Sequence, residues 1–372
     1  MDVAGLRTLV VNAGSSSVKL RLLDTDDSLL DGRDLSVARG RMDEARLVEA
    51  LEGWRPDVAA HRVVHGGRRF RAAVRVDDQV RRELEDLTEL APLHQPKSLA
   101  ALDAVSRALP EAPAVACFDT AFHATLPAAA ATYALPASLR ERFGLRRYGF
   151  HGLSHAYASR RAAELLERPA AGLRVVTCHL GAGASLAAVR DGRPLDTTMG
   201  FTPLEGLVMA TRSGNVDPGL LLWLLERGRM SASELAEALE HESGLLGLAG
   251  SPDMREVLAR REAGDAGAAL ALAVYSHRLR AGIAAMAAAL GGLDALAFTG
   301  GVGENAARVR TAAADGLGFL GVELDEERNG SARLDSEVGR AGAPVRTLVI
   351  AAREDLEMAR QVGELMRSGR ER

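Results

Sequence analysis

The fold is decided by residues 6–23, which read Leu-Arg-Thr-Leu-Val-Val-Asn-Ala-Gly-Ser-Ser-Ser-Val-Lys-Leu-Arg-Leu-Leu. Residues 6–11 are rich in aliphatic and β-branched side chains, and residues 18–23 alternate apolar with polar side chains, as a half-buried strand does. The small polar residues 12–17 between them have the composition of a turn. The stretch therefore predicts a strand, a tight turn and a second strand.

The same arrangement returns in the middle of the chain. Residues 173–178 predict a strand, residues 179–185 a turn of small residues, and residues 186–189 a second strand. When Ser17 is placed over Ser185 the flanking apolar runs coincide, although the letters differ. A repeat of this kind is what two related lobes would show.

Strands and helices alternate through the rest of the chain. The expected strands are 58–65, 114–119 and 293–299, and the expected helices are 97–109, 219–226, 266–290 and 354–366. Such alternation predicts an α/β architecture whose sheets are covered by helices. A length of 372 residues suits two lobes better than one core.

Composition excludes several classes of protein. The formal net charge of −4 offers no basic field for nucleic acid. No apolar run reaches the roughly 18 residues of a membrane span, and no signal peptide is apparent at the N-terminus. Cys117 and Cys178 lie in apolar runs and form no Cys-x-x-Cys pair, so we expect buried free thiols and a cytoplasmic location.

Three turns of small residues follow predicted strands, at 12–17, 179–185 and 300–305. Such turns let backbone N–H groups approach phosphate oxygens closely, so three of them favour a nucleotide site. The chain has no Gly-x-x-x-x-Gly-Lys motif, which excludes a P-loop enzyme. Ala306 stands where the dinucleotide fingerprint has its third glycine, which argues against that fold as well.

Two arginines stand out by their context. Arg62 lies in an apolar strand and Arg212 lies among turn residues. A guanidinium in such a place needs an anion, which is either a structural carboxylate or a phosphoryl group. Beside three phosphate-type turns, we favour the phosphoryl group. Asp119 ends an apolar strand, which is a common place for a catalytic residue, whereas Glu354 alone needs no more explanation than the dipole of its helix.

The histidines do not predict a zinc site. His61 and His65 lie about 13 Å apart on a strand, and the pair His151 and His155 lacks the glutamate of a His-Glu-x-x-His motif. We expect His61, like His241 and His277, to be a hydrogen-bonded structural histidine.

Eight segments, taken together and in order, resemble the acetate kinase (acetokinase) family across almost the whole chain. They are residues 10–19 (Val-Val-Asn-Ala-Gly-Ser-Ser-Ser-Val-Lys), 61–67 (His-Arg-Val-Val-His-Gly-Gly), 91–94 (Ala-Pro-Leu-His), 118–123 (Phe-Asp-Thr-Ala-Phe-His), 148–152 (Tyr-Gly-Phe-His-Gly), 177–181 (Thr-Cys-His-Leu-Gly), 199–206 (Met-Gly-Phe-Thr-Pro-Leu-Glu-Gly) and 301–305 (Gly-Val-Gly-Glu-Asn). Each segment is weak evidence alone, and the ordered set is highly specific.

The resemblance implies a two-lobed actin-like ATPase fold, built from duplicated ribonuclease H-like domains around a nucleotide cleft. The expected N-terminal lobe is residues 1–150 with 356–372, and the nucleotide-binding lobe is residues 151–355. The family forms homodimers and carries out Mg²⁺-dependent transfer of the γ-phosphoryl group of ATP to the carboxylate of acetate, reversibly and in line. Mn²⁺ is an alternative metal. Because site residues come from both halves, the resemblance also implies that the lobes close.

Carried over by motif, the resemblance assigns roles to individual residues. The metal would be organised by Asn12 and Glu354, and the catalytic group would be Arg62, Asp119, His151, His179 and Arg212, with His94 in support. The acetate methyl would be held by Val64, Leu93, Phe150 and Pro203, beside Arg62. Nucleotide contacts would come from Lys19, His179, Leu180, Gly181, Ala182, Gly183, Asp253, Met254, Arg255, Gly301, Val302, Gly303, Glu304 and Asn305.

The chain departs from the family pattern at three of these places. Ala182 replaces an asparagine of the phosphate turn, Arg353 replaces an asparagine before Glu354, and Met254 stands where an aromatic residue is common. Two alternatives stay open at this point. One is a kinase for a longer acid, such as propionate or butyrate, and the other is an ATP-binding regulatory protein without catalysis.

Overall fold

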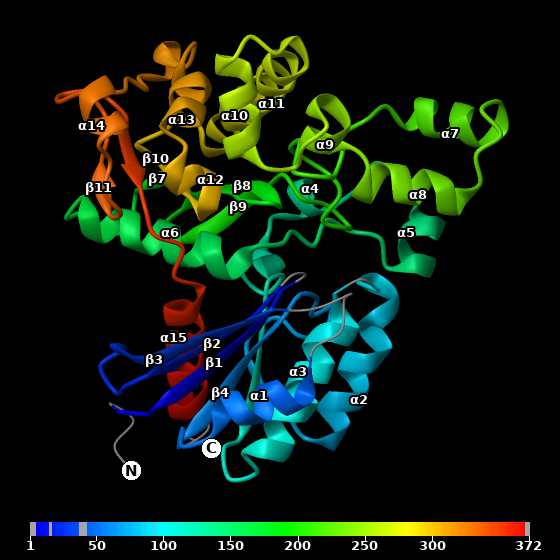
Figure 1. The fold of residues 1–372 in the computed structure, drawn as a ribbon, viewed down its shortest axis with the longest axis vertical. Coiled ribbons are helices and arrows are strands. Elements are labelled where there is room, and N and C mark those ends of the chain that lie inside the picture. Colours follow the sequence, from blue (N-terminus) through cyan, green and yellow to red (C-terminus); the bar gives the residue numbers. More distant parts are fainter. Residues whose placement is uncertain (1–4, 15–16, 37–42, 93, 369–372) are drawn as a thin grey trace. The chain divides into compact units, whose positions relative to one another are not determined.

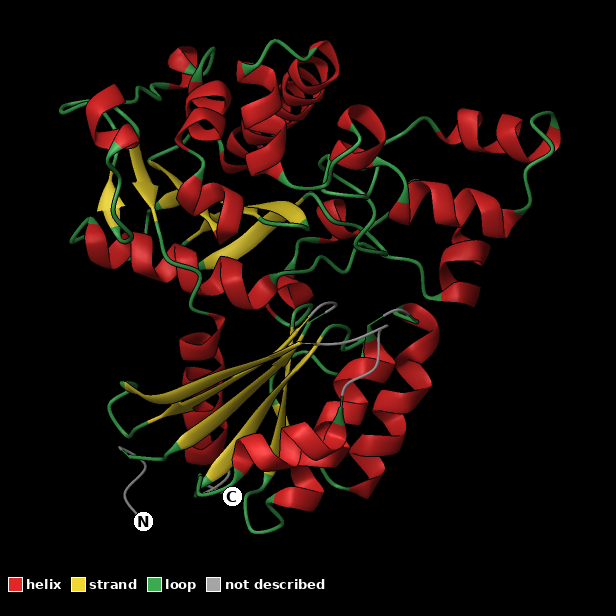
Figure 2. Cartoon of the chain, in the orientation of Figure 1, coloured by secondary structure: helices red, strands yellow, loops and turns green. Residues whose placement is uncertain are grey.

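The computed structural model describes residues 5–14, 17–36, 43–92 and 94–368. The chain forms two compact units: residues 1–124 together with 353–372, and residues 125–352. Each unit contains one mixed six-stranded sheet with helices packed on it (Figures 1 and 2).

The sheet of the first unit has the strand order β3-β2-β1-β4-β6-β5. Its strands are β1 (Thr8–Ala13), β2 (Ser17–Leu23), β3 (Leu29–Ser36), β4 (Val58–Val63), β5 (Val74–Arg75) and β6 (Ala114–Phe118). The first three strands form an antiparallel meander, while β1, β4 and β6 run parallel. The predicted hairpin at 6–23 is therefore confirmed as β1 and β2.

Helices cover both faces of this sheet. They are α1 (Glu44–Leu51), α2 (Asp78–Asp86), α3 (Gln95–Ala108) and α15 (Glu354–Ser368). Leu9, Val11 and Ala59 point to α1 and α3 in one apolar cluster, with Leu47 and Ala104 from those helices. The alternate residues face α15, which packs on β1, β4 and β6. Since side chains alternate along a strand, Asn12 and Arg62 lie on the α15 face.

The sheet of the second unit has the order β11-β12-β10-β7-β8-β9. Its strands are β7 (Arg174–Leu180), β8 (Ala184–Arg190), β9 (Arg193–Thr197), β10 (Ala295–Thr299), β11 (Ser336–Glu337) and β12 (Arg346–Val349). Read from β9, this order repeats that of the first sheet read from β3, with the same antiparallel meander followed by two parallel strands. The predicted internal repeat is thus confirmed at the level of topology.

The helices of the second unit are α4 (Ala128–Ala131), α5 (Ala137–Phe143), α6 (Gly152–Leu165), α7 (Pro218–Glu226), α8 (Ala232–His241), α9 (Gly244–Ala249), α10 (Met254–Glu262), α11 (Ala266–Leu290), α12 (Gly300–Asn305), α13 (Ala307–Ala314) and α14 (Glu326–Gly330). Helix α11 has the predicted bounds, and Asp217 caps α7 as its Asp-Pro sequence indicates. The prediction of a turn at 300–305 was wrong, because α12 begins at Gly300 without a preceding loop. Gly300 takes a positive φ of 78°, and a β-carbon there would lie 2.8 Å from the carbonyl oxygen of Leu180.

The unit boundaries differ from the expected lobes. The sequence predicts that the first lobe ends at residue 150, whereas the first unit ends at Ala124. It predicts that the chain returns to the first lobe at residue 356, whereas the return is at Arg353. The physical reason lies in the segment before α6. The amide N–H of Tyr148 donates to the carbonyl of Gly200, and the guanidinium of Arg147 donates to the carbonyls of Thr198 and Met199. These bonds tie residues 147 and 148 to the segment that follows β9 of the second unit.

Two expectations from composition can be compared with the fold. Both cysteines are free and fully buried, as predicted. Burial raises the pKa of each thiol. Within the described ranges, no helix is both long enough and apolar enough to cross a membrane.

Candidate functional site

The first unit gathers four of the predicted site residues into one charged cluster. The Arg62 guanidinium donates to Asp119 through Nε (3.0 Å to Oδ1) and Nη2 (2.6 Å to Oδ2). Its Nη1 donates to Oδ1 of Asn12 at 3.1 Å, and Nδ2 of Asn12 donates to Oε2 of Glu354 at 2.9 Å. Oε2 of Glu354 also lies 3.8 Å from Arg62 Nη1. Residues from β1, β4, α15 and the end of β6 thus meet through side-chain contacts.

Two carboxylates share the Arg62 guanidinium in a poorly hydrated place, where the Asp119 side chain is 2% exposed. Burial lowers the pKa of Arg62, but Asp119 and Glu354 outweigh it, so that the pKa is raised and Arg62 stays charged. Burial raises the pKa of Asp119, and Arg62 opposes that shift. The sequence left two anions open for Arg62, a structural carboxylate or a phosphoryl group. The structure shows the carboxylate, which is that of Asp119.

The cluster suits a cation that keeps part of its coordination for another ligand. Mg²⁺ is held by one or two carboxylates together with water and substrate phosphates, and rarely by a protein cage. In the part of the chain that the structure describes, no group of three or more His, Cys, Asp or Glu side chains is placed to hold a metal. Glu354 and Asn12 fit the first kind of site, because they supply a carboxylate and an amide oxygen next to one another.

The other predicted residues of the first unit are less informative. Lys19 is exposed and pairs with Asn12 across β1 and β2, which puts both side chains on one face of the sheet. Val64 is 8% exposed and follows β4. His94 precedes α3. Leu93 lies outside the described residues, as do Ser15 and Ser16 of the first turn.

His61 contradicts our expectation of a hydrogen-bonded histidine. Its side chain lies on the α3 face of β4 and is 1% exposed, and neither ring nitrogen has a hydrogen-bond partner among the described residues. Burial lowers the pKa of His61 to about 4, against a small opposing effect of Asp103. His65 differs, because its Nδ1 accepts from the N–H of Gly67.

The second unit gathers a group of histidines around the turn between β7 and β8. His151 precedes α6 in a left-handed backbone conformation (φ 54°, ψ 26°), which costs an ordinary side chain roughly 1–2 kcal/mol. Its ring stacks on that of His179, with centroids 4.2 Å apart. Nδ1 of His151 lies 2.9 Å from Oγ of Ser185, and Nδ1 of His179 lies 2.8 Å from Oγ of Ser154. A strained histidine held by polar neighbours is typical of a functional site.

Arg212 completes this group. A β-carbon built on Gly183 would lie 2.9 Å from Nη2 of Arg212 and 3.2 Å from Cε1 of His151, so both side chains lie against the Gly183 backbone. Nη1 of Arg212 donates to the carbonyl of Pro203 at 2.7 Å. Among the described residues no carboxylate lies within ion-pair distance of it; burial lowers its pKa, and the more distant Glu240 opposes that shift. Arg212 is therefore a partly buried cation that no described carboxylate contacts.

The predicted nucleotide residues occupy two places in this unit. Since β10 runs parallel to β7 with Thr299 beside His179, the turn at 181–183 and the start of α12 lie at one edge of the sheet. Gly301 and Asn305 are exposed, whereas Oε1 of Glu304 accepts from the N–H groups of Gly300 and Ala352. At this edge of the sheet the backbone therefore carries small residues, and this is what a backbone needs for a close approach to phosphate.

The segment at 253–255 behaves differently from its neighbours. Asp253 caps α10 and pairs with Arg255, whose side chain is 90% exposed. The side chain of Met254 is only 4% exposed, so it packs inside the unit. Two of the residues predicted to hold the acetate methyl also lie in this unit. Phe150 is 1% exposed and directly precedes His151, and Pro203 is partly exposed.

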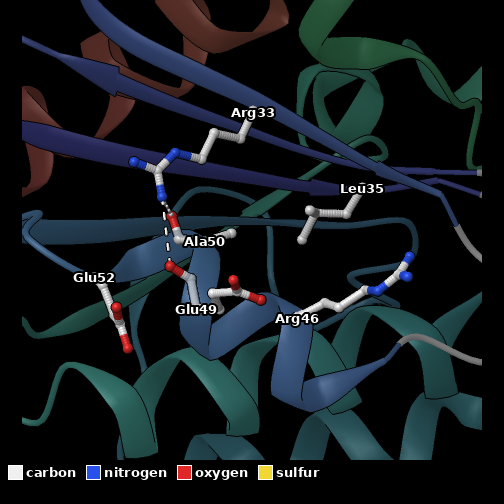
Figure 3. Close-up of a pocket in the computed structure, with 6 residues that line it drawn as sticks. All are labelled: Arg33, Leu35, Arg46, Glu49, Ala50 and Glu52. Carbon is white, nitrogen blue, oxygen red and sulfur yellow. Dashed lines mark hydrogen bonds between the residues drawn. The ribbon is translucent and has the colours of Figure 1, made fainter.

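A surface hollow in the first unit is lined by none of the predicted site residues. Figure 3 shows it between β3 and α1. Nη1 of Arg33 donates to the carbonyls of Glu49 and Ala50 there, at 3.5 and 2.6 Å, and so satisfies the C-terminal end of α1. Its guanidinium also lies over the Trp54 ring. These contacts give Arg33 a structural role.

Sequence reasoning missed the polar residues behind the histidine group. Ser154, Ser185 and Thr177 are fully buried and carry hydrogen bonds to histidine rings. One available signal was the spacing of His151 and His155, which places both on one side of α6. Ser154 lies on α6 itself, whereas Thr177 and Ser185 lie on separate strands that the sheet register brings together.

Two units that repeat one sheet order, with charged groups at the ends of their central strands, define a protein of the actin-like, sugar kinase and Hsp70 fold class. Comparison with known proteins narrows this class. Residues 54–360 match the model of the acetokinase family, and the chain belongs to that family. It is 44% identical to the acetate kinase of Gloeobacter violaceus, over 97% of this chain and 100% of the relative.

Two solved structures have the same fold over nearly the whole chain. The acetate kinase of Porphyromonas gingivalis has a TM-score of 0.88 and 34% identity, with coverage of 97% of this chain and 100% of that one. The propionate kinase of Francisella tularensis has a TM-score of 0.88 and 36% identity, with coverage of 96% and 98%.

Proposed function

We propose that the protein is an acetate kinase, which transfers the γ-phosphoryl group of ATP in line to the carboxylate of acetate and catalyses the reverse reaction. The observation that carries the proposal is Arg212, a partly buried guanidinium that no described carboxylate contacts, beside His151 and the small-residue turn. A phosphoryl group supplies the anion that this cation lacks. Family membership identifies the reaction in which such a group is transferred.

Each of the proposed site residues has one role in the transfer. Arg212 and Arg62 would neutralise charge on the equatorial oxygens, and ring nitrogens of His151 and His179 would donate to them. The acceptor is already a carboxylate, so the site needs no general base. Asp119 holds Arg62 in one orientation through its bidentate bonds. Donors held in place in this way are each worth about 10²–10³ in rate.

The metal and the co-substrate follow from the same family. We propose that Glu354 and Asn12 hold Mg²⁺, with Mn²⁺ as an alternative, and that the ion neutralises phosphate charge when bound. The phosphates of ATP or ADP would contact the backbone of residues 180–183 with Lys19, and residues 301–305 and 253–255 would lie toward the adenosine. Since Met254 is buried, its backbone and its neighbours would make those contacts.

The acid that accepts the phosphoryl group is proposed from the apolar residues. Val64, Leu93, Phe150 and Pro203 are the residues proposed to accommodate the methyl group of acetate. The likeness to a propionate kinase keeps a longer acid as the second candidate. One methylene changes discrimination by only about 1–3 kcal/mol. The ratio of kcat/KM for acetate, propionate and butyrate decides between them.

Acetyl phosphate formation, trapped as the hydroxamate with ATP, Mg²⁺ and acetate, tests the proposal. Arg212→Ala should lower kcat about 10²- to 10³-fold, because it removes a positioned cation from the transferred group. Arg340→Ala is the matched control, since Arg340 pairs with Glu323 on the surface. Folded protein that binds ATP but phosphorylates none of the three acids would overturn the proposal in favour of a regulatory ATP-binding protein.

We also propose that the protein is a homodimer of the cytoplasm. Helix α7 presents an exceptionally apolar run, Leu-Leu-Leu-Trp-Leu-Leu, and buries none of its residues within the chain. Leu222 is 59% exposed and Trp223 57%. An exposed apolar surface of this kind marks an interaction site, and a second copy of the chain is the partner that the family implies. Two unpaired buried thiols suit a reducing compartment.

A further inference from the structure

A chain of hydrogen bonds leads from His151 into the interior of the second unit. Nδ1 of His151 lies 2.9 Å from Oγ of Ser185, which lies 2.7 Å from Nε2 of His155. Nδ1 of His155 lies 2.8 Å from Oγ1 of Thr177, and this hydroxyl lies 3.4 Å from the carbonyl oxygen of Ala187. Ser185, His155 and Thr177 are each 0% exposed, so bulk water does not reach them.

The direction of the chain follows from the assignment of the Thr177 proton at its far end. The carbonyl oxygen of Ala187 only accepts, so the 3.4 Å contact assigns the hydroxyl proton of Thr177 to it. With that assignment, Oγ1 of Thr177 accepts from Nδ1–H of His155 at 2.8 Å. A neutral His155 then has an unprotonated Nε2, which accepts from the hydroxyl of Ser185. Oγ of Ser185 in turn accepts from Nδ1–H of His151. Every donor in the chain points away from His151 and toward the sheet.

We infer that Thr177, His155 and Ser185 act as a positioning relay that holds His151 in its Nδ1–H form. Nε2 of His151 lies on the side of Gly183, 3.3 Å from the place of a β-carbon. In the neutral ring this nitrogen only accepts, and it donates only when the ring is an imidazolium. The relay is compatible with both charge states, because Nδ1 keeps its proton in each.

The inference rests on the proposed function for its consequence, though not for its test. If His151 donates to a phosphoryl oxygen, the relay makes that donor a cation and not a neutral N–H group. Hydrogen bonds from a charged donor are about twice as strong as those from a neutral one. The neighbouring His179 has no such constraint from its contact with Ser154, since a hydroxyl either donates to Nδ1 or accepts from it.

The test is the tautomer of each ring, measured by two-dimensional ¹H–¹⁵N correlation of the histidine side chains. In the unmodified protein both His151 and His155 should show a pyrrole-type Nδ1 and a pyridine-type Nε2 when neutral. His151→Asn and His155→Asn assign the signals, and asparagine tolerates the left-handed backbone of position 151. A protonated Nε2 on either neutral ring would overturn the inference without any variant in the relay.

Thr177→Val gives the sharper result, because valine keeps the shape and removes the hydroxyl. Without the acceptor for Nδ1–H, His155 should change to its Nε2–H form, Ser185 should turn its proton toward His151, and His151 should become the Nε2–H tautomer three hydrogen bonds away. Thr177→Ser keeps the hydroxyl and should leave both rings unchanged. An unchanged His151 in Thr177→Val would contradict the relay.

Kinetics separates this inference from the proposed function. Thr177→Val should lower kcat about tenfold, as expected for a charged donor replaced by a neutral one, with KM for ATP changed less than about twofold. Thr177→Ser should restore the rate. If the unmodified protein forms no acyl phosphate, the proposed function fails while the tautomers still decide the relay.

Discussion

At the scale of single residues, the two arginines of the candidate site differ in the partners of their guanidinium groups. Arg62 donates to Asp119 and Asn12, whereas the described residues give Arg212 one hydrogen-bond acceptor, the carbonyl of Pro203. Under the proposed function, the phosphoryl group is the anion that pairs with Arg212. The sequence did not reveal this difference in partners, because a carboxylate 57 positions from Arg62 is invisible in the local pattern.

His61, like His65, is a histidine whose pKa is lowered to about 4 by burial. Its pKa falls from 6.5 to about 4 on folding, so the unfolded chain binds the additional proton between these values. Stability therefore rises with pH across this window, and acidification from pH 6.5 to 4 removes about 3 kcal/mol through this group. His61→Leu should remove that part of the pH dependence and be neutral or stabilising at pH 7, because two unpaired buried nitrogens disappear.

Urea unfolding at pH 7, 5.5 and 4.5 measures the effect of this change. His277→Leu serves as the control, since His277 is exposed on α11. Equal slopes of the free energy of unfolding with pH in the unmodified protein and in His61→Leu would show that His61 is not the responsible group.

At the scale of elements, the β7–β8 turn offers a test that alters no functional group. A β-carbon on Gly183 would lie 2.9 Å from Nη2 of Arg212 and 3.2 Å from His151, while one on Gly181 would meet nothing closer than 3.4 Å. Gly183→Ala should therefore displace both side chains and lower kcat about 10²-fold, in line with misplacement by about 1 Å. Gly181→Ala, two residues away, should retain the rate to within a few fold.

These two glycine variants need matched melting temperatures for the comparison to hold. A rate for Gly183→Ala equal to that of Gly181→Ala would mean that Arg212 and His151 do not act from their observed positions.

The elements also show how far the sequence predicts this fold. Both strand–turn–strand repeats were predictable, because alternation of apolar residues is a local property of the chain. The start of the second unit was not, since it depends on bonds from Arg147 and Tyr148 to residues some 50 positions later. The relay behind His151 was also hidden, because register alone brings Thr177 and Ser185 to one histidine.

At the scale of the whole molecule, the apolar face of α7 predicts an oligomer. Trp223→Glu should convert a homodimer into a monomer, because a charge in the centre of an apolar interface is not solvated there. Light scattering coupled to size-exclusion chromatography gives the mass directly, against 39.3 kDa for one chain. Leu270→Glu on α11, where the leucine is 57% exposed, should leave the mass unchanged. A monomeric unmodified protein would exclude the homodimer.

The return of the last helix to the first unit has a consequence for biosynthesis. Glu354, which bonds Asn12, emerges from the ribosome only after residues 125–352 have been made, a delay of roughly 10 to 50 s at ordinary elongation rates. Until then the nascent first unit lacks both α15, which covers one face of its sheet, and the carboxylate that completes its charged cluster. Chains released before residue 354 would carry Arg62 and Asp119 without the Glu354 carboxylate, so the charged cluster would stay incomplete in them.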